Sequence, residues 1–223
     1  MKKNFLKLTL LSFIAVLAYS CKGNEKSETG DPQDKMEATS DATTYVADVD
    51  GTQIEWEGRK LTGNHTGYLN IAKGYINLNE NNEIAGGEFV IDMSTITVTD
   101  LEEGEGKRRL EGHLKGTVEG QEGDFFNITK YPTGKFVVTG MEVADGKTWM
   151  VGNLTLKETT RNVKFPVNLS LDGDKLILQS EQFEIDRTEW DVNFRSRSVF
   201  PNVGDLVIFD DIKLTVYLEA DKA

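Results

Sequence analysis

The only two histidines of the chain, His65 and His113, are its most versatile candidates for acid–base or metal chemistry. Imidazole changes charge near neutral pH and is the commonest metal ligand among protein side chains. A zinc site needs further ligands at a recognisable spacing, and neither histidine stands in such a pattern. We therefore interpret His65 as part of a polar turn and His113 as a hydrogen-bonded group, with metal binding and catalysis as alternatives.

Arginines next to aromatic residues form a second group with binding chemistry. Arg195 and Arg197 lie in the charged and aromatic segment 186–205, and guanidinium groups suit carboxylates and phosphates. Asp186 and Arg187 are expected to form an ion pair that holds this segment in place, with an anionic ligand of Arg187 as the alternative. The aromatic residues of the segment are Trp190, Phe194 and Phe200.

Enzymatic motifs are missing from the sequence. It contains no G-x-S-x-G motif, no nucleophile–base set and no glycine-rich loop that opens a helix. The formal net charge of −12 repels the phosphates of nucleic acid, and no basic stripe with interleaved aromatics compensates for it. The sequence therefore predicts a protein that is not an enzyme, carries no metal or other cofactor and does not bind nucleic acid.

The single cysteine, Cys21, ends a predicted export signal. Two lysines precede an apolar run from Phe5 to Leu17 that is too short to span a bilayer comfortably. Ala18-Tyr19-Ser20-Cys21 resembles the cleavage site of a bacterial lipoprotein, and an ordinary secretory signal is the alternative. Residues 1–21 are thus expected to be a lipoprotein signal that leaves the protein anchored through Cys21 in the cell envelope, on its periplasmic side or at the cell surface.

The rest of the chain divides into a polar segment and one domain. Residues 22–43 are rich in Ser, Thr, Asp, Glu, Lys and Gly and lack apolar periodicity, which predicts a flexible tether. Residues 44–220 hold nearly all of the aromatic residues and are long enough to bury a core without disulfides.

Apolar residues recur at every second position of this domain, which is typical of β-strands. Phe165, Val167 and Leu169, for example, alternate with Pro166 and Asn168. Turn signals of the Asp-Gly type separate the runs. Strands are expected near 44–49, 53–61, 66–78, 84–92, 135–144, 148–157, 163–171, 175–185 and 206–219.

Residues 99–116 break the alternation. Leu110 and Leu114 lie four positions apart with His113 between them, which predicts a short amphipathic helix or an irregular crossover. Many antiparallel strands with one mid-chain helix favour a closed barrel of about eight strands, because closure removes exposed sheet edges. A β-sandwich is the structural alternative.

Several short stretches of residues 45–220 occur in a fixed order. They include Tyr45-Val46-Ala47-Asp48, Ile54-Glu55-Trp56, Gly63-Asn64-His65-Thr66-Gly67, Gly86-Gly87-Glu88-Phe89, His113-Leu114-Lys115, Asp124-Phe125-Phe126, Gly152-Asn153-Leu154 and Ile185-Asp186-Arg187. In these stretches the chain resembles the YceI-like family of bacterial exported proteins. The resemblance implies an all-β, extended antiparallel, lipocalin-like barrel with an elongated apolar cavity, to which the residue pattern adds a short helix in a mid-chain crossover.

The resemblance also implies a function. Members of the family hold a long-chain amphiphile, such as a polyisoprenoid, an isoprenoid quinone or a fatty-acid derivative. We therefore expect an envelope lipoprotein that binds one hydrophobic small molecule for carriage, storage or stress protection. The alternative is a barrel filled by side chains that acts through protein contacts, and both a monomer and a homodimer stay open.

Candidate site residues follow from the family positions and from the aromatic content. His65, His113, Arg195 and Arg197 are expected to contact a polar headgroup. The aromatic residues expected to line the cavity are Trp56, Phe89, Phe125, Phe126, Phe136, Phe183 and Trp190.

Overall fold

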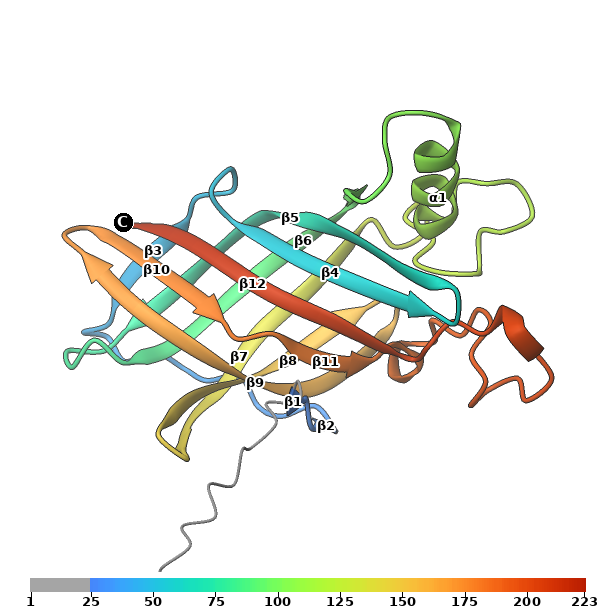
Figure 1. Cartoon of the computed structure of the whole chain (residues 1–223). Coiled ribbons are helices and arrows are strands. Elements are labelled where there is room, and N and C mark those ends of the chain that lie inside the picture. Colours follow the sequence, from blue (N-terminus) through green and yellow to red (C-terminus); the bar gives the residue numbers. More distant parts are fainter. Residues whose placement is uncertain (1–24) are drawn as a thin grey trace, which may run out of the picture.

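The computed structural model of the chain describes residues 25–223 (Figure 1). The expected signal with Cys21 lies outside these residues. The strands are β1 (Glu25–Lys26), β2 (Thr29–Gly30), β3 (Thr43–Ala47), β4 (Gln53–Lys60), β5 (Gly63–Leu78), β6 (Ile84–Val98), β7 (Thr133–Ala144), β8 (Lys147–Leu156), β9 (Thr159–Asp172), β10 (Lys175–Ser180), β11 (Phe183–Asp186) and β12 (Asp211–Lys222). The helices are α1 (Glu105–Lys115) and two 3-10 helices, Arg187–Trp190 and Gly204–Leu206.

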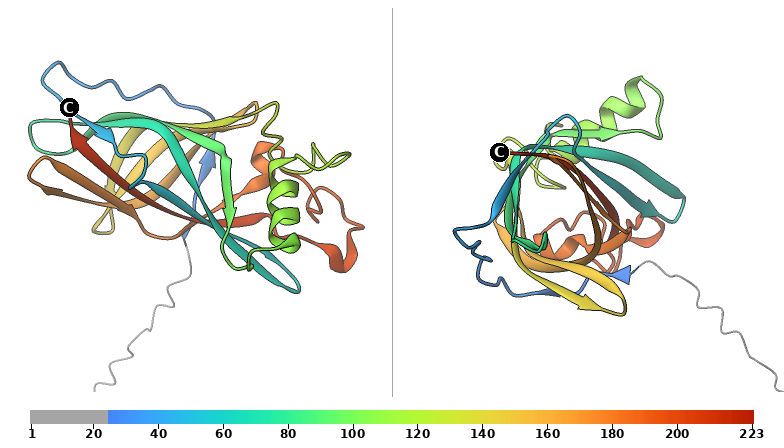
Figure 2. Two further views of the ribbon diagram at one scale, coloured as in Figure 1. Left: turned by 90° about the horizontal axis from the view of Figure 1, so that it is seen from above. Right: turned by 90° about the vertical axis from the view of Figure 1, so that its left-hand side faces the viewer.

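Eight strands form a ring in the order β4–β5–β6–β7–β8–β9–β10–β12, and all neighbours in it are antiparallel. The ring closes because β12 pairs with β4 from Lys213↔Glu57 to Tyr217↔Gln53. The right-hand view of Figure 2 shows this ring end-on. The predicted eight-stranded antiparallel barrel is confirmed, and the sandwich alternative is wrong.

The barrel is elongated because its strands are long and two short strands extend the ring. β5 has 16 residues and β6 has 15. β3 continues the line of β4 between β5 and β12, and β11 continues the line of β10 along β12. The expected strand 175–185 is therefore two strands, and the expected strand 84–92 continues to Val98.

Inward-facing apolar residues from all around the ring make the core. Val163, Phe165 and Val167 of β9 are buried, and the ring of Phe165 stacks on Phe183 with centroids 4.4 Å apart. The ring of Phe136 lies over Gly152, where an added Cβ would be 2.2 Å from ring atom Cζ. Only glycine leaves room for this packing.

Helix α1 forms within the predicted region 99–116 and lies at one end of the barrel, called the mouth here (Figures 1 and 2). Glu105 in its first turn and Lys115 in its last turn complement the helix dipole. The helix ends at Gly116, whose φ of 69° is a left-handed conformation that glycine adopts without strain. Among residues 25–223, no helix is both long enough and apolar enough to cross a membrane.

Residues 25–43, called the N-terminal strap here, lie against the outside of the barrel, although 22–43 is expected to be a flexible tether. β1 pairs with β11 and β2 pairs with β9. Farther along, Gln33 exchanges two hydrogen bonds with the side chain of Asn153 on β8. Met36 donates its N–H to the carbonyl of Val138, just past the last β6–β7 pair, Glu88↔Val137. The strap thus crosses β9, β8 and β7 in turn.

Candidate binding cavity

An apolar cavity of about 260 Å³ lies inside the barrel. This volume is close to the lower end of the roughly 300–1,000 Å³ that is typical of small-molecule sites. The wall includes side chains from all eight strands of the ring, and Leu110 and Leu114 of α1 cover it at the mouth. Its apolar residues farther inside include Ile71, Ile91, Met150, Leu178 and Leu218.

Strand β4 supplies a row of lining positions because side chains alternate between the two faces of a strand. Ile54, Trp56, Gly58 and Lys60 all line the cavity. Trp56 lies opposite Gly67 on β5, where an added Cβ would come within 2.5 Å of the indole ring. Gly67 therefore makes room for Trp56. The row of lining positions ends at the mouth with Lys60, which is a cation.

The polar part of the cavity wall is small and carries no acid. No aspartate or glutamate of the described residues lines the cavity, although the chain contains 37 of these residues against 25 lysines and arginines. The polar lining residues are Thr52, Arg59, Lys60, His65 and Arg187. The charged groups of the wall are therefore all basic.

His65 lines the cavity and is held by an aspartate behind it. Its Nδ1 lies 2.8 Å from Asp100 Oδ2, and its Nε2 lies 3.4 Å from Lys60 Nζ. Since Asp100 accepts from Nδ1–H, Nε2 of the neutral ring is the acceptor that faces Lys60. Burial alone would raise the pKa of Asp100, but hydrogen bonds from the Thr66 N–H and from His65 outweigh it and hold that pKa below its usual value.

Several donors in the cavity wall lack acceptors. Trp56 Nε1 and Arg59 Nε are both buried without a hydrogen-bond partner. Arg59 uses Nη2 for Glu184 at 3.4 Å, which leaves its Nε unpaired. Within the described part of the chain, no carboxylate lies within ion-pair distance of Lys60 Nζ. Leaving buried donors unpaired costs about 1–3 kcal/mol each, and the two nitrogens are covered by protein atoms rather than open to the cavity.

His113 does not line the cavity and holds α1 over the mouth instead. Its Nε2 lies 2.6 Å from Asp124 Oδ2. Its ring packs edge-on against Phe125 and Phe194, with centroids 5.0 Å and 4.9 Å away. His113 therefore joins the helix to the segments on both sides of it.

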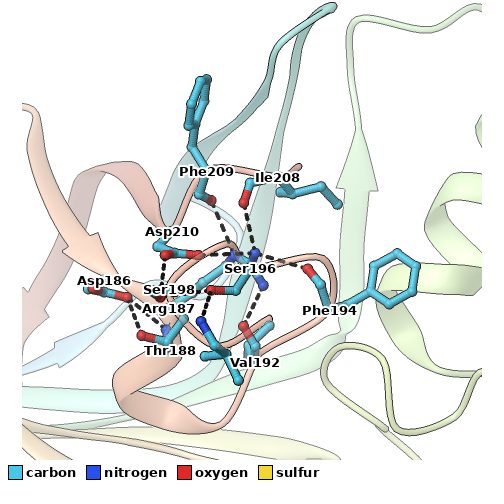
Figure 3. Close-up of polar contacts among 11 residues, drawn as sticks. Asp186, Arg187, Thr188, Val192, Phe194, Ser196, Ser198, Ile208, Phe209 and Asp210 are labelled. Atoms are coloured by element: carbon cyan, nitrogen blue, oxygen red, sulfur yellow. Dashed lines mark hydrogen bonds and ion pairs between the residues drawn. The ribbon is translucent and has the colours of Figure 1, made fainter. Parts of the chain in front are cut away.

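Arg187 is 4% exposed and organises segment 187–210 at the mouth (Figure 3). Its ion-pair partner is Asp210 at 3.4 Å and not the expected Asp186, which accepts from the N–H of Thr188. Burial lowers the pKa of the guanidinium from its ordinary value, and nearby Asp210 and Asp186 oppose that shift. Arg187 also donates to the backbone carbonyls of Val192, Phe194, Ile208 and Phe209.

The other two headgroup candidates lie outside the cavity. Arg195 is exposed with its guanidinium 4.9 Å from the ring centroid of Phe194, and Arg197 is exposed and donates to the carbonyl of Gly204. Of the four candidates, the structure places only His65 in the wall. Composition alone had singled out these arginines, and it carries no information on which way a loop side chain points.

Six of the seven aromatic candidates lie in the cavity wall, namely Trp56, Phe89, Phe125, Phe126, Phe136 and Phe183. Trp190 is fully buried elsewhere, because its indole N–H donates to the carbonyl of Leu154. The sequence analysis missed Arg59 and Lys60. The alternation of Ile54, Trp56 and Gly58 would have indicated Lys60, which is next in that row.

No group of three or more His, Cys, Asp or Glu side chains among residues 25–223 could hold a metal ion. Exposed apolar side chains also gather near the mouth, on the β4–β5 turn and on segment 187–210. These are Leu61, Val199, Phe200, Leu206 and Phe209.

Comparisons with known proteins agree with this fold. The model of the YceI-like domain matches residues 45–220. A search of curated proteins finds no match. The chain is similar to BcnA of Burkholderia cenocepacia, with a TM-score of 0.60 and 16% identity, over 78% of this chain and 99% of BcnA. It is also similar to a polyisoprenoid-binding domain of Saccharophagus degradans implicated in plant cell wall breakdown, with a TM-score of 0.55 and 12% identity, over 80% and 98% of the two chains.

Proposed function

Because the chain belongs to the YceI-like domain family, we propose that it binds one long-chain amphiphile with the apolar chain in the barrel and the headgroup at the mouth. The observation that carries this proposal is the cavity, whose wall is apolar except for a few polar residues. A cavity of this kind also favours ligand binding over a barrel filled by side chains that acts through protein contacts.

The energetics support a chain-shaped ligand. Each methylene group that moves from water into the cavity contributes about 0.8 kcal/mol. A chain of ten or so carbons therefore gains enough to offset the freedom that it loses on binding. A polyisoprenoid, an isoprenoid quinone and a fatty-acid derivative all provide such a chain.

We further propose that the protein is a non-enzymatic lipoprotein of the bacterial envelope, anchored through Cys21 and acting in carriage, storage or stress protection of its ligand. The exposed apolar residues at the mouth support exchange with a lipid phase, because an apolar chain that enters there avoids water.

Blocking the cavity tests the binding function. Gly58 lines the cavity, and an added Cβ would meet only Ile212 Cδ1 at an ordinary 3.7 Å. The substitution Gly58→Phe should therefore fill the cavity near the mouth and lower the amount of bound lipid at least about tenfold, because the chain loses its burial site. Native mass spectrometry of protein purified from its own host measures the occupancy.

The matched control is Gly30→Phe, because Gly30 lies on the strap and has nothing within 4 Å of an added Cβ. It should leave lipid occupancy unchanged. Wild-type protein that is consistently empty, or a Gly58→Phe variant as fully loaded as wild type, would contradict the proposed function.

A further inference from the structure

Building on the proposed function, we propose that the cavity selects an amphiphile with an anionic headgroup, a carboxylate or a phosphate monoester, which binds Lys60 at the mouth, next to His65. A neutral headgroup such as that of a quinone or an alcohol would bind more weakly. The inference narrows the ligand class and replaces Arg195 and Arg197, which do not line the cavity, as the headgroup contacts.

The first support is the sign of the charges in the wall. Three cations, Arg59, Lys60 and Arg187, belong to the residues that line the cavity, and no carboxylate among the described residues lines it with them. Arg59 pairs with Glu184 and Arg187 pairs with Asp210, whereas Lys60 has no carboxylate partner among the described residues. An anionic headgroup at the mouth would supply the opposite charge that Lys60 lacks.

The second support is the position of Lys60. It ends the cavity-lining row of β4 at the mouth, where its side chain is also exposed to solvent, and its only described polar contact is Nε2 of His65 at 3.4 Å. Asp100 engages the opposite nitrogen of that ring at 2.8 Å. An anionic oxygen placed next to Lys60 Nζ accepts from the ammonium group, which His65 Nε2 holds at the mouth.

The other cations at the mouth have different roles. Arg187 donates to four backbone carbonyls and pairs with Asp210. These contacts hold segment 187–210 together. Arg195 and Arg197 are exposed and do not line the cavity. Lys60 is therefore the cation best placed to receive a headgroup.

Matched probes test the inference on the full-length chain. Dodecanoate, dodecyl phosphate and dodecanol carry the same alkyl chain, so isothermal titration calorimetry at pH 7 isolates the effect of the headgroup. We expect one or both anions to bind about tenfold or more tightly than dodecanol. The tighter of the two anions identifies the headgroup as carboxylate or phosphate. Added salt should weaken the anions more than the alcohol.

Variants locate the effect. Lys60→Met should remove most of the preference for the anion and leave the affinity for dodecanol within about twofold, whereas Lys60→Arg should keep the preference. Lys73→Met is the control, because Lys73 is an exposed lysine of β5 that does not line the cavity. It should bind all three probes as wild type does.

The outcomes separate this inference from the proposed function. If dodecanol binds as tightly as both anions, or if Lys60→Met keeps the full preference, the anionic site is refuted and the proposed function stands. If none of the three probes binds, the proposed function fails as well.

Discussion

At the residue scale, alternation places every second side chain of β4 on the cavity, and Arg59 near the mouth is the exception. Lys60 lines the cavity, whereas Glu57 of the same strand pairs with Lys213 at 3.3 Å and does not line it. Alternation of this kind can be predicted from the sequence, and it applies to the four lining aromatics that lie on strands, Trp56, Phe89, Phe136 and Phe183, but not to Phe125 and Phe126 in the segment after α1. The hydrogen bond that buries Trp190 and the pairing of Arg187 with Asp210 join residues far apart in the chain, so local patterns could not predict them.

Asp100, at the mouth, should make the stability of the protein depend on pH. The folded pKa of Asp100 lies below its ordinary value of 3.8, so the charged carboxylate contributes stability above that value. This stability is lost as the pH falls through the folded pKa. The Asp100→Asn variant should therefore be less stable than wild type at pH 7, and the difference should shrink as the pH drops below about 4.

Urea unfolding of both proteins between pH 7 and pH 3 measures this difference. Asp174→Asn, in the exposed turn after β9, controls for the removal of one negative charge. A difference between wild type and Asp100→Asn that stays the same down to pH 3 would show that Asp100 does not stabilise the mouth in this way.

At the scale of elements, segment 187–210 is irregular and relies on one buried cation for its shape. Arg187 donates to carbonyls on both arms of the segment, and Asp210 neutralises its charge (Figure 3). The sequence analysis distinguished this stretch only as a charged and aromatic segment. Composition could not predict that Arg187 organises the segment, because its partners are backbone carbonyls, which every residue type carries.

Replacing that cation should loosen the whole segment. Arg187→Met leaves several carbonyls and Asp210 without their donor, and the expected loss in the free energy of unfolding is about 3–5 kcal/mol. Urea unfolding measures the loss, and limited proteolysis should cut between residues 191 and 206. Arg197→Met, which removes an exposed arginine, should cost less than about 1 kcal/mol. Equal stability of the two variants would refute the role of Arg187.

At the scale of the whole molecule, the barrel follows from strand alternation, whereas the N-terminal strap does not. The strap is polar and lacks apolar periodicity, which is typical of a flexible tether. Its contacts are mostly backbone hydrogen bonds and short polar side chains, such as Ser27 Oγ with the carbonyl of Lys164 at 2.9 Å. Such contacts need an open strand edge or a matching side chain, and neither can be predicted from the composition of the strap.

Anchoring through Cys21 stays a prediction for the whole molecule. Cell fractionation should find the wild-type protein with the membranes and the Cys21→Ser variant in the soluble fraction, because one residue carries all of the acyl chains. Mass spectrometry of the mature N-terminus provides a second readout. A wild-type protein with an unmodified Cys21 would contradict the prediction.

The strap also limits how far an anchored barrel could travel. A free tether of residues 22–43 could stretch roughly 70–80 Å, but only four peptide steps separate Cys21 from Glu25, which β1 fixes beside β11. Those steps span at most about 14 Å. The barrel of a lipidated protein of this geometry would stay close to the membrane leaflet that holds its acyl chains. It would exchange ligand with that leaflet, so any carriage would run along this membrane rather than across to an opposing one.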